Sequence, residues 1–336
     1  MKLIPVFITT LLGTLAGVTR SAETPVAVPE YKIISKTVLG GDGGWDYLNL
    51  DAAARKLYVA RSNRFMIIDV DTGKLAGELQ SVTGAHGIAL LPDKKMGYAT
   101  SGKDDTVRVF DLQTLKETKS IPVGKKPDAI LLDPASKKIF VFNNGATTAS
   151  VIDPANDTVI GTIELGGNPE FPVADGAGRI FVNIEDKSEV AVIDTAKLSM
   201  TQHWLLAPGV EPTGLALDSA HHRLFSGCRG SKTLVIMDSE SGKVITSLPI
   251  GSGVDATAFD VATQNVFSSN GEGTLSIIHE DTPDSFRVVQ TLPTQAGART
   301  CTLDPKTHQV LLVAAVQDRE TRAVTPDTFT LIKVGQ

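Results

Sequence analysis

A unit of roughly 40 residues recurs seven times along this chain, and this repeat constrains the fold more than any other feature. The unit is clearest in residues 127–167, where four short segments rich in apolar residues alternate with turn residues. The turns are Asp133-Pro134, Asn143-Asn144-Gly145 and Asp153-Pro154, and Gly166-Gly167 closes the unit. Four short strands in roughly 40 residues are typical of one β-propeller blade.

The turn that follows the first strand of the unit sets the period. We place it at Asp51, Pro92, Asp133, Asp175, Asp218, Asp260 and Asp304, with spacings of 41, 41, 42, 43, 42 and 44 residues. The second strand recurs as LYVA, GYAT, IFVF, IFVN, LFSG, VFSS and VLLV. The third strand ends at Asp69, Asp111, Asp153, Asp194, Asp238 and His279 in the first six units. The turn, the second strand and the third strand thus recur with the same period, and this predicts an all-β, seven-bladed propeller with four-stranded blades.

The last repeat lacks a fourth strand, because the sequence stops at Gln336 just after the third. The missing strand is present at the other end of the chain. Residues 31–41, YKIISKTVLGG, match the fourth strand of the unit but precede the first repeat. We therefore expect this N-terminal strand to complete the last blade, which would leave no open sheet edge at the junction.

Several segments carry a resemblance to a known family. Tyr58-Val59 and Phe181-Val182-Asn183, with the valine-isoleucine-aspartate strands that follow, resemble the YVTN family of bacterial β-propellers. AHGIAL, PTGLALD, GVDATAFD and GARTCTLD are similar to segments of its YncE-like branch. The resemblance covers almost everything after residue 22. It implies the propeller fold and leaves the activity open.

The N-terminus has the pattern of a secretory signal peptide. Lys2 is followed by an apolar stretch over residues 3–18, and small residues follow near Ser21-Ala22. We expect residues 1–22 to be removed, residues 23–30 to form a disordered Pro-rich leader and residues 31–336 to form one domain. The mature protein is then expected to be periplasmic or secreted, with no membrane span and as a monomer.

Charge and cysteine content exclude several function classes. The net charge is −6, and loss of Lys2 and Arg20 with the signal would make it −8. With no basic cluster interleaved with aromatic residues, nucleic acid is disfavoured as a partner. The two cysteines, Cys228 and Cys301, form no CxxC motif, which excludes covalent c-type haem and disfavours a cysteine zinc site.

Charged residues recur at the start of the innermost strands, where propellers place their channel mouth. The residue five positions before each turn marker is Asp46, Gly87, Asp128, Glu170, Thr213, Asp255 or Arg299, and His86 is next to Gly87. We expect four carboxylates, one imidazole and one guanidinium to converge on one rim.

This ring admits three interpretations. It can bind a small ligand or a partner's loop. Asp46, Asp128, Glu170 and Asp255 can instead hold Ca²⁺ or another divalent cation, which could activate water on a lactone or ester. In the third interpretation Asp46, Asp128 and Asp255 only cap loop amides, as aspartates in turns often do. A pairing of Arg299 with a carboxylate would favour structural electrostatics over a metal.

The loops between second and third strands face the same mouth. They carry Arg61, Asn63, Arg64, Lys103, Asn143, Asn144, Asn183, Arg229 and Asn270, of which the basic residues suit an anionic ligand. We include Asn183 and Arg229 with Asp46, His86, Asp128, Glu170, Asp255 and Arg299 among the candidate ligand-binding residues. The loop of residues 316–328 is the longest and is a candidate lid or partner-binding element. His221-His222 lie on the opposite face, and we expect them to be turn residues.

The sequence thus favours an exported ligand-binding or protein-interaction module with a carboxylate-rich channel mouth. The alternative is a metal-dependent lactonase or related hydrolase at the same mouth. No GxSxG, P-loop or HExxH motif is present to support another chemistry.

Overall fold

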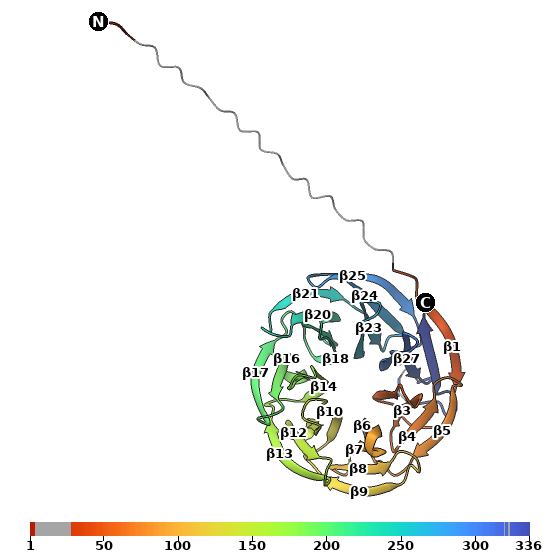
Figure 1. The fold of residues 1–336 in the computed structure, drawn as a ribbon. Helices are drawn as coiled ribbons and strands as arrows, with labels where there is room; N and C mark the ends of the chain where they lie inside the picture. The colour runs from red at the N-terminus through yellow and green to blue at the C-terminus, as the bar shows by residue number, and fades with distance from the viewer. Residues whose placement is uncertain (4–27, 319, 322) are drawn as a thin grey trace.

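The strands of this protein form a closed ring of seven four-stranded antiparallel sheets, as the repeat predicts (Figure 1). The computed structural model describes residues 1–3, 28–318, 320–321 and 323–336. Most of the expected signal peptide and residues 23–27 of the expected leader lie outside the described residues. Among those described, no helix has the length and apolar character needed to cross a membrane.

Each blade takes its strands in chain order from the centre outward, except the last. The strands are β2 (Leu48–Asp51), β3 (Lys56–Arg61), β4 (Arg64–Asp69) and β5 (Lys74–Leu79) in blade 1; β6 (Ala85–Leu91), β7 (Met96–Ser101), β8 (Thr106–Asp111) and β9 (Glu117–Pro122) in blade 2; β10 (Pro127–Leu132), β11 (Ile139–Asn143), β12 (Thr148–Asp153) and β13 (Thr158–Glu164) in blade 3; β14 (Pro169–Ala174), β15 (Arg179–Ile184), β16 (Glu189–Asp194) and β17 (Ser199–Leu205) in blade 4; β18 (Pro212–Asp218), β19 (Arg223–Cys228), β20 (Thr233–Asp238) and β21 (Val244–Pro249) in blade 5; β22 (Val254–Asp260), β23 (Asn265–Asn270), β24 (Thr274–Thr282) and β25 (Ser285–Pro293) in blade 6; and β26 (Cys301–Asp304), β27 (Gln309–Ala314), β28 (Thr330–Gly335) and β1 (Lys32–Val38) in blade 7. Short 3₁₀ turns occur at η1 (Pro92–Lys94), η2 (Asn144–Ala146) and η3 (Glu185–Lys187).

The core lies between neighbouring blades and is built mainly from their second and third strands. β11 is buried along its whole length, and the outermost strand of that blade, β13, is mostly exposed. β-branched and aromatic residues suit these strands because they pack well on a pleated surface. Cys228 and Cys301 are both buried and unpaired.

The N-terminal strand completes blade 7, as predicted. β1 pairs antiparallel with β28, from Lys32 opposite Gly335 to Val38 opposite Thr330. Tyr31 extends this junction into blade 6, because Asn265 Nδ2 donates to its hydroxyl at 3.0 Å and its ring packs edge-on against Phe267.

The aspartate that ends the third strand has a structural task. Asp69, Asp111, Asp153, Asp194 and Asp238 each accept a hydrogen bond from the backbone N–H of a residue two or three positions ahead. Blade 6 has His279 at this position. There the strands continue past the usual turn, and β24 and β25 are nine residues each.

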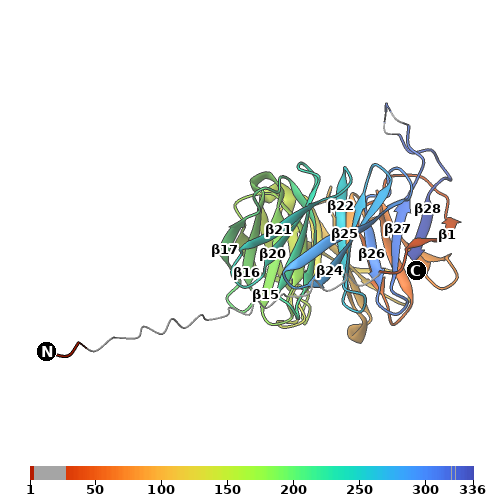
Figure 2. The same ribbon diagram turned by 90° about the horizontal axis from the view of Figure 1, so that it is seen from above.

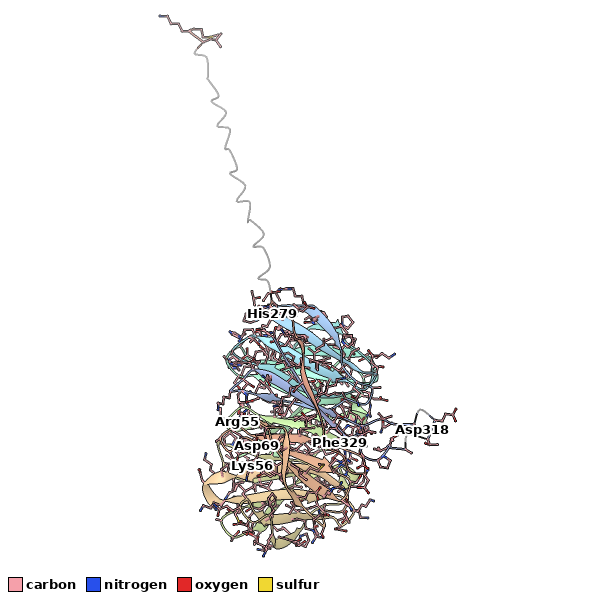
Figure 3. The ribbon with its side chains drawn as sticks, turned by 90° about the vertical axis from the view of Figure 1, so that its right-hand side faces the viewer. Arg55, Lys56, Asp69, His279, Asp318 and Phe329 are labelled. Carbon is pink, nitrogen blue, oxygen red and sulfur yellow. The ribbon has the colours of Figure 1, made fainter. Side chains whose placement is uncertain are left out.

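The two faces of the ring differ. The connection between β27 and β28 stands out from one face when the ring is seen from the side (Figure 2). Asp318 belongs to this connection, and Arg55, in the turn between β2 and β3, lies toward the opposite face (Figure 3). This separates the mouth that carries the long loop from the face that carries the turns between first and second strands.

Candidate functional site

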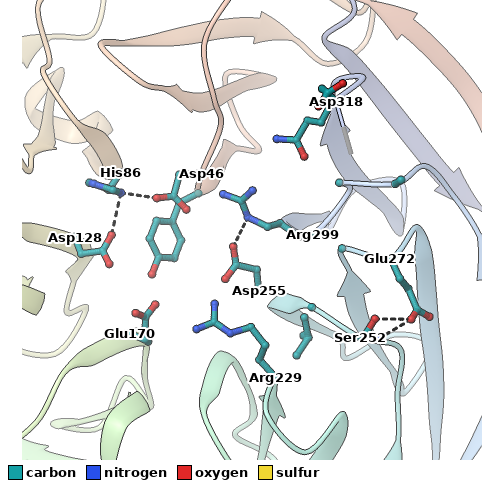
Figure 4. A pocket seen from close by; sticks show the side chains of 17 residues that line it. Asp46, His86, Asp128, Glu170, Arg229, Ser252, Asp255, Glu272, Arg299 and Asp318 are labelled. Carbon is teal, nitrogen blue, oxygen red and sulfur yellow. Dashed lines mark hydrogen bonds and ion pairs between the residues drawn. The ribbon is translucent and has the colours of Figure 1, made fainter. Parts of the chain in front are cut away.

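A polar cavity of about 690 Å³ opens at the centre of the ring (Figure 4). Its wall consists mainly of residues at the starts of innermost strands and of residues in the loops beside them. The lining residues are Asp46, Tyr47, His86, Asp128, Glu170, Arg229, Ser252, Gly253, Val254, Asp255, Gly271, Glu272, Ala296, Gly297, Arg299, Gln317 and Asp318. A cavity of about 200 Å³ adjoins it through His86, Asp128 and Glu170.

The repeat explains why charged groups converge here. Asp128, Glu170 and Asp255 are each the second residue of an innermost strand, β10, β14 and β22. Equivalent positions in a ring of blades face one axis, so these long acidic side chains reach the channel, whereas the short Thr213 at the same position of β18 stays buried between blades. Asp46 and Arg299 lie just before β2 and β26 and reach the same cavity.

Blade 2 requires a correction by one residue. Ala85 pairs with Ser101 at the start of β6, as Pro127 pairs with Asn143 at the start of β10. His86 is therefore equivalent to Asp128, and the Gly87 assigned to this position from the sequence is the next residue. Gly87 lies against blade 3, where an added Cβ would be 2.8 Å from the Asp128 carbonyl oxygen.

One wall of the cavity carries an imidazole between two carboxylates. His86 Nδ1 is 2.5 Å from Asp46 Oδ2 and 3.2 Å from Asp128 Oδ1. Burial lowers the pKa of His86, but the hydrogen bond to Asp46 and the charge of Asp128 outweigh it, so the net pKa is raised. Burial, followed by the charge of Asp46, raises the pKa of Asp128.

Glu170 is the least compensated carboxylate of this wall. Its Oε1 is 3.3 Å from Asn144 Nδ2, and no ion pair of Glu170 occurs in the described part of the chain. Burial and then the charges of Asp128 and Glu185 raise its pKa well above the usual range. We name Asp46, His86, Asp128 and Glu170 the acidic wall.

On the other side of the cavity, arginines pair with carboxylates. Arg299 Nε donates to Asp255 Oδ2 at 2.6 Å, and another nitrogen of Arg299 donates to the Trp45 carbonyl oxygen at 2.8 Å. Arg229 forms an ion pair with Glu185. Burial raises the pKa of Asp255, and the Arg299 guanidinium offsets part of this effect. Because Asp255 has this arginine partner, we do not include it in the acidic wall.

The capping interpretation does not describe these aspartates. Within the described residues, the hydrogen-bond and ion-pair partners of Asp46, Asp128 and Asp255 are side chains and not backbone amides. Asp128 Oδ1 has no hydrogen bond of good geometry.

The structure does not bring all the expected rim residues to the cavity. Asn183 lies inside the blades, where its Nδ2 donates to the carbonyl oxygens of Thr213 and Gly214 at 3.0 and 3.1 Å. Thr213 is also buried, and its hydroxyl donates to the Val254 carbonyl oxygen. Other residues of the second-to-third-strand loops are buried as well, namely Arg61, Asn143 and Asn270. Asn183 therefore has no direct access to a ligand, whereas Arg229 lines the cavity.

Tyr47 is a site residue that sequence reasoning missed. It lines the cavity and packs against Phe171 with ring centroids 5.4 Å apart. Burial, and then the charges of Asp128 and Glu170, raise its pKa well above the usual value, so its hydroxyl stays protonated. Its position directly after Asp46, at the entry to the first innermost strand, was the available signal. Ser252 and Glu272, which hydrogen-bond to each other on the rim, were missed as well.

The expected long loop contributes to the cavity wall. Gln317 and Asp318 line the cavity, and Asp318 Oδ1 accepts hydrogen bonds from the Glu320 and Thr321 backbone amides. The part of this loop that the structure describes therefore borders the site.

Comparison with known proteins found no match, because no protein-family model matches the chain and no curated protein does.

Proposed function

We propose that this chain is an exported member of the YVTN family, close to its YncE-like branch, and that its central cavity binds a ligand or partner group with a positively charged end. The propeller fold suits a binding or interaction module. The observation that carries the proposal is the acidic wall, where two carboxylates pair with a single imidazole and a third, Glu170, has no ion pair among the described residues.

The charges of the cavity favour a ligand with two different ends. Burial, and then repulsion by neighbouring carboxylates, raise the pKa values of Asp128 and Glu170, and a cation beside them would offset both effects. Arg229 and Arg299 lie on the other side, where a hydrogen-bond acceptor or an anionic group of the same ligand fits. A small zwitterionic molecule or a charged peptide loop meets both requirements.

A second candidate function rests on a specific geometric observation. One ligand atom from each of Asp46, His86 and Asp128 lies within 4.8 Å of the others, which is compact enough for one metal ion. A Ca²⁺ or other divalent ion held there would supply a Lewis acid for hydrolysis of a lactone or ester. This chain's residues would hold the ion on the acidic wall, while Arg299 and Tyr47 face the same cavity.

Thermal melts of the mature protein test both candidates. The probes are arginine, cadaverine, CaCl₂, MnCl₂ and a panel of simple lactones, and the variants are Asp128→Asn and Glu170→Gln. Glu272→Gln is the matched control, because it makes the same change on the same rim where the carboxylate is already bound by Ser252. We expect a probe to raise the Tm of the parent and of the control, and to have little effect on the two acidic-wall variants.

The outcomes separate the candidates. A stabilisation by an organic cation that survives a chelator supports the binding module. A stabilisation by a divalent ion that is lost in His86→Ala and abolished by a chelator supports the metal centre, and lactone turnover would then establish the hydrolase. Equal responses of the parent and both acidic-wall variants to every probe would reject the acidic wall as a ligand site.

Export has its own test. The charged start and apolar stretch of residues 1–18 support secretion, and we expect the mature chain to begin between residues 17 and 24. N-terminal sequencing of the protein from the periplasm or medium measures this position. Recovery of a membrane-bound form that retains Met1 would contradict it.

A further inference from the structure

A second group of metal-ligating side chains lies where blade 5 meets blade 6, far along the blades from the central cavity. It consists of Asp218 at the end of β18, His221 in the turn that follows and Glu280 in β24. One ligand atom of each lies within 4.8 Å of the others. Asp218 and Glu280 have exposed fractions of only 1% and 3%, so two carboxylates share one buried place.

The hydrogen bonds within this group are incomplete. His221 Nδ1 is 2.6 Å from Asp218 Oδ2 and 3.2 Å from Glu280 Oε1. A single N–H cannot serve both carboxylates, and neither oxygen of Glu280 has a hydrogen bond of good geometry within the described residues. A buried carboxylate without donors is costly unless a cation accompanies it.

The neighbouring arginine is already occupied. Arg223 donates to Asp238, to Asp284 and to backbone carbonyl oxygens that include Pro283. It lies close enough to moderate the charge of Glu280, but burial and Asp218 still raise the pKa of Glu280 above its usual value. Arg223 therefore does not fully compensate the negative charge of Asp218 and Glu280.

We call the contact between two neighbouring blades a joint. The next two joints in the ring differ from the joint of blades 5 and 6. At the joint of blades 7 and 1, Arg55 donates two hydrogen bonds to Asp304. At the joint of blades 6 and 7, His308 Nδ1 is 3.1 Å from both oxygens of Asp260. Both basic side chains come from the same turn position, which has a left-handed backbone. That position in blade 6 is Gln264, whose amide donates within its own turn, to the Val261 carbonyl oxygen.

Glu280 is also an exception to the repeat. Its backbone N–H donates to the carbonyl oxygen of Gln264. The residues that make the same bond in four other blades are uncharged, namely Val70, Leu112, Thr195 and Ser239. Blade 6 thus has an amide where the next two joints have a basic side chain, and it adds a carboxylate to the joint with blade 5.

The chemistry of the three ligands indicates the kind of ion. Imidazole nitrogen with two carboxylate oxygens suits Zn²⁺ and related transition metals better than Ca²⁺, which prefers more oxygen ligands. Zinc bonds of about 2.0–2.2 Å place tetrahedral ligand atoms roughly 3.3–3.6 Å apart, close to the 3.2 Å between His221 and Glu280. The 2.6 Å between His221 and Asp218 is a hydrogen-bond distance, which lengthens when an ion takes the place of the proton. His221 has 39% of its side chain exposed, which leaves room for water at a fourth position.

We propose that Asp218, His221 and Glu280 bind one divalent transition-metal ion, with zinc the best fit, and that this ion joins blade 5 to blade 6. When the ion binds, the proton on His221 Nδ1 passes to solvent and the neutral ring keeps a proton on Nε2, because the Nδ1 lone pair must face the metal. The ion then takes the place of the basic side chain that the following blade supplies at each of the next two joints.

Zinc titration of the mature chain in a His86→Ala background tests this site, because that background removes the imidazole of the central cavity. The protein is first freed of metal with a chelator, and bound zinc and Tm are then measured. We expect one bound equivalent per chain and a Tm that rises with zinc. Asp218→Asn, His221→Ala and Glu280→Gln should each lose both effects, whereas His222→Ala, the exposed neighbour, should keep them.

Glu280→Gln provides a readout that a purely structural network would not give. Without zinc this variant should melt no lower than its parent, because it removes a buried charge, and with zinc it should melt below the parent. A background protein that binds no zinc would overturn the proposal. It would also be overturned by a zinc response that persists in Glu280→Gln, or by a Glu280→Gln melt below the parent in chelator.

Discussion

At the scale of single residues, burial determines what each carboxylate of the cavity does. Glu170 and Glu272 line the same cavity, but their environments shift the carboxyl pKa in opposite directions. Burial and neighbouring negative charges raise the pKa of Glu170, whereas hydrogen bonds, first that from the Ser252 hydroxyl, lower the pKa of Glu272. One cavity thus contains a carboxylate that resists ionisation and another that favours it.

This difference predicts a stability change of opposite sign in two matched variants. The raised pKa of Glu170 means that its stability contribution is full below the unfolded pKa of about 4.3 and is lost as pH rises. Glu170→Gln should therefore raise stability at pH 8 by about 1–2 kcal/mol, with no gain at pH 4.

Urea unfolding at pH 4, 6 and 8 measures the effect. Glu272→Gln should show no gain at pH 8 and a small loss, because its lowered pKa marks an ionised form that the fold stabilises. A Glu170→Gln variant that is less stable than the parent at pH 8 would show that the carboxylate has a stabilising partner.

The sequence could predict which residues converge, but not which way every side chain points. Asp46, Asp128, Glu170 and Asp255 were found because the repeat places equivalent residues around one axis. Asn183 was misplaced because side-chain direction alternates along a strand, and a turn motif does not fix that alternation. Tyr47 was missed because the charged residues mark the position before it, and the residue after that position is apolar in other blades, such as Ala129 and Phe171.

At the scale of elements, the junction of β1 with β28 is the clearest success of the repeat pattern. The fourth-strand motif in residues 31–41 gave both the strand and its partner. The one-residue shift in blade 2 arose because Pro92, a strong turn residue, follows Leu91, the true equivalent of Asp133. The joint of blades 5 and 6 was not foreseen, because Glu280 becomes unusual only when the register is known.

Removal of residues 31–41 should destabilise the protein severely. β28 would lose its partner along six paired positions, and the edge of blade 7 would be open. Thermal melting of the truncated protein measures the loss. An unchanged Tm would mean that this strand does not hold the ring together.

A milder change tests the contact that Tyr31 makes with blade 6. Tyr31→Phe keeps the ring packed on Phe267 but removes the acceptor of the Asn265 amide. Leaving a buried amide donor unpaired should cost about 1–3 kcal/mol. Equal stability of Tyr31→Phe and the parent in urea unfolding would show that another group accepts this hydrogen bond.

At the scale of the whole molecule, the ring has two regions with excess negative charge, the central cavity and the joint of blades 5 and 6, toward opposite ends of the innermost strands. β18 connects the two ends of a blade, since Thr213 is near its cavity end and Asp218 is at its far end. Five residues of strand span roughly 17 Å. Cations at the central cavity and at the joint of blades 5 and 6 should therefore act independently.

Independence predicts additive stabilisation. The Tm gain from a cavity ligand and the gain from zinc should sum when both are present, and Glu280→Gln should leave the first unchanged. Differential scanning calorimetry with each addition alone and with both together measures this. A strong departure from additivity would show that the ring transmits strain between its faces.

The pairing of β1 with β28 also sets an order in time. Lys32 lies opposite Gly335, so the last contact joins residues separated by most of the chain. Blades 1 to 6 can form in sequence as their strands become available, but β1 has to remain unpaired until β28 has been synthesised and released. During that interval an unpartnered strand and an open blade are exposed to other chains. Protection by a chaperone, or rapid passage through this stage, is thus a requirement of the architecture.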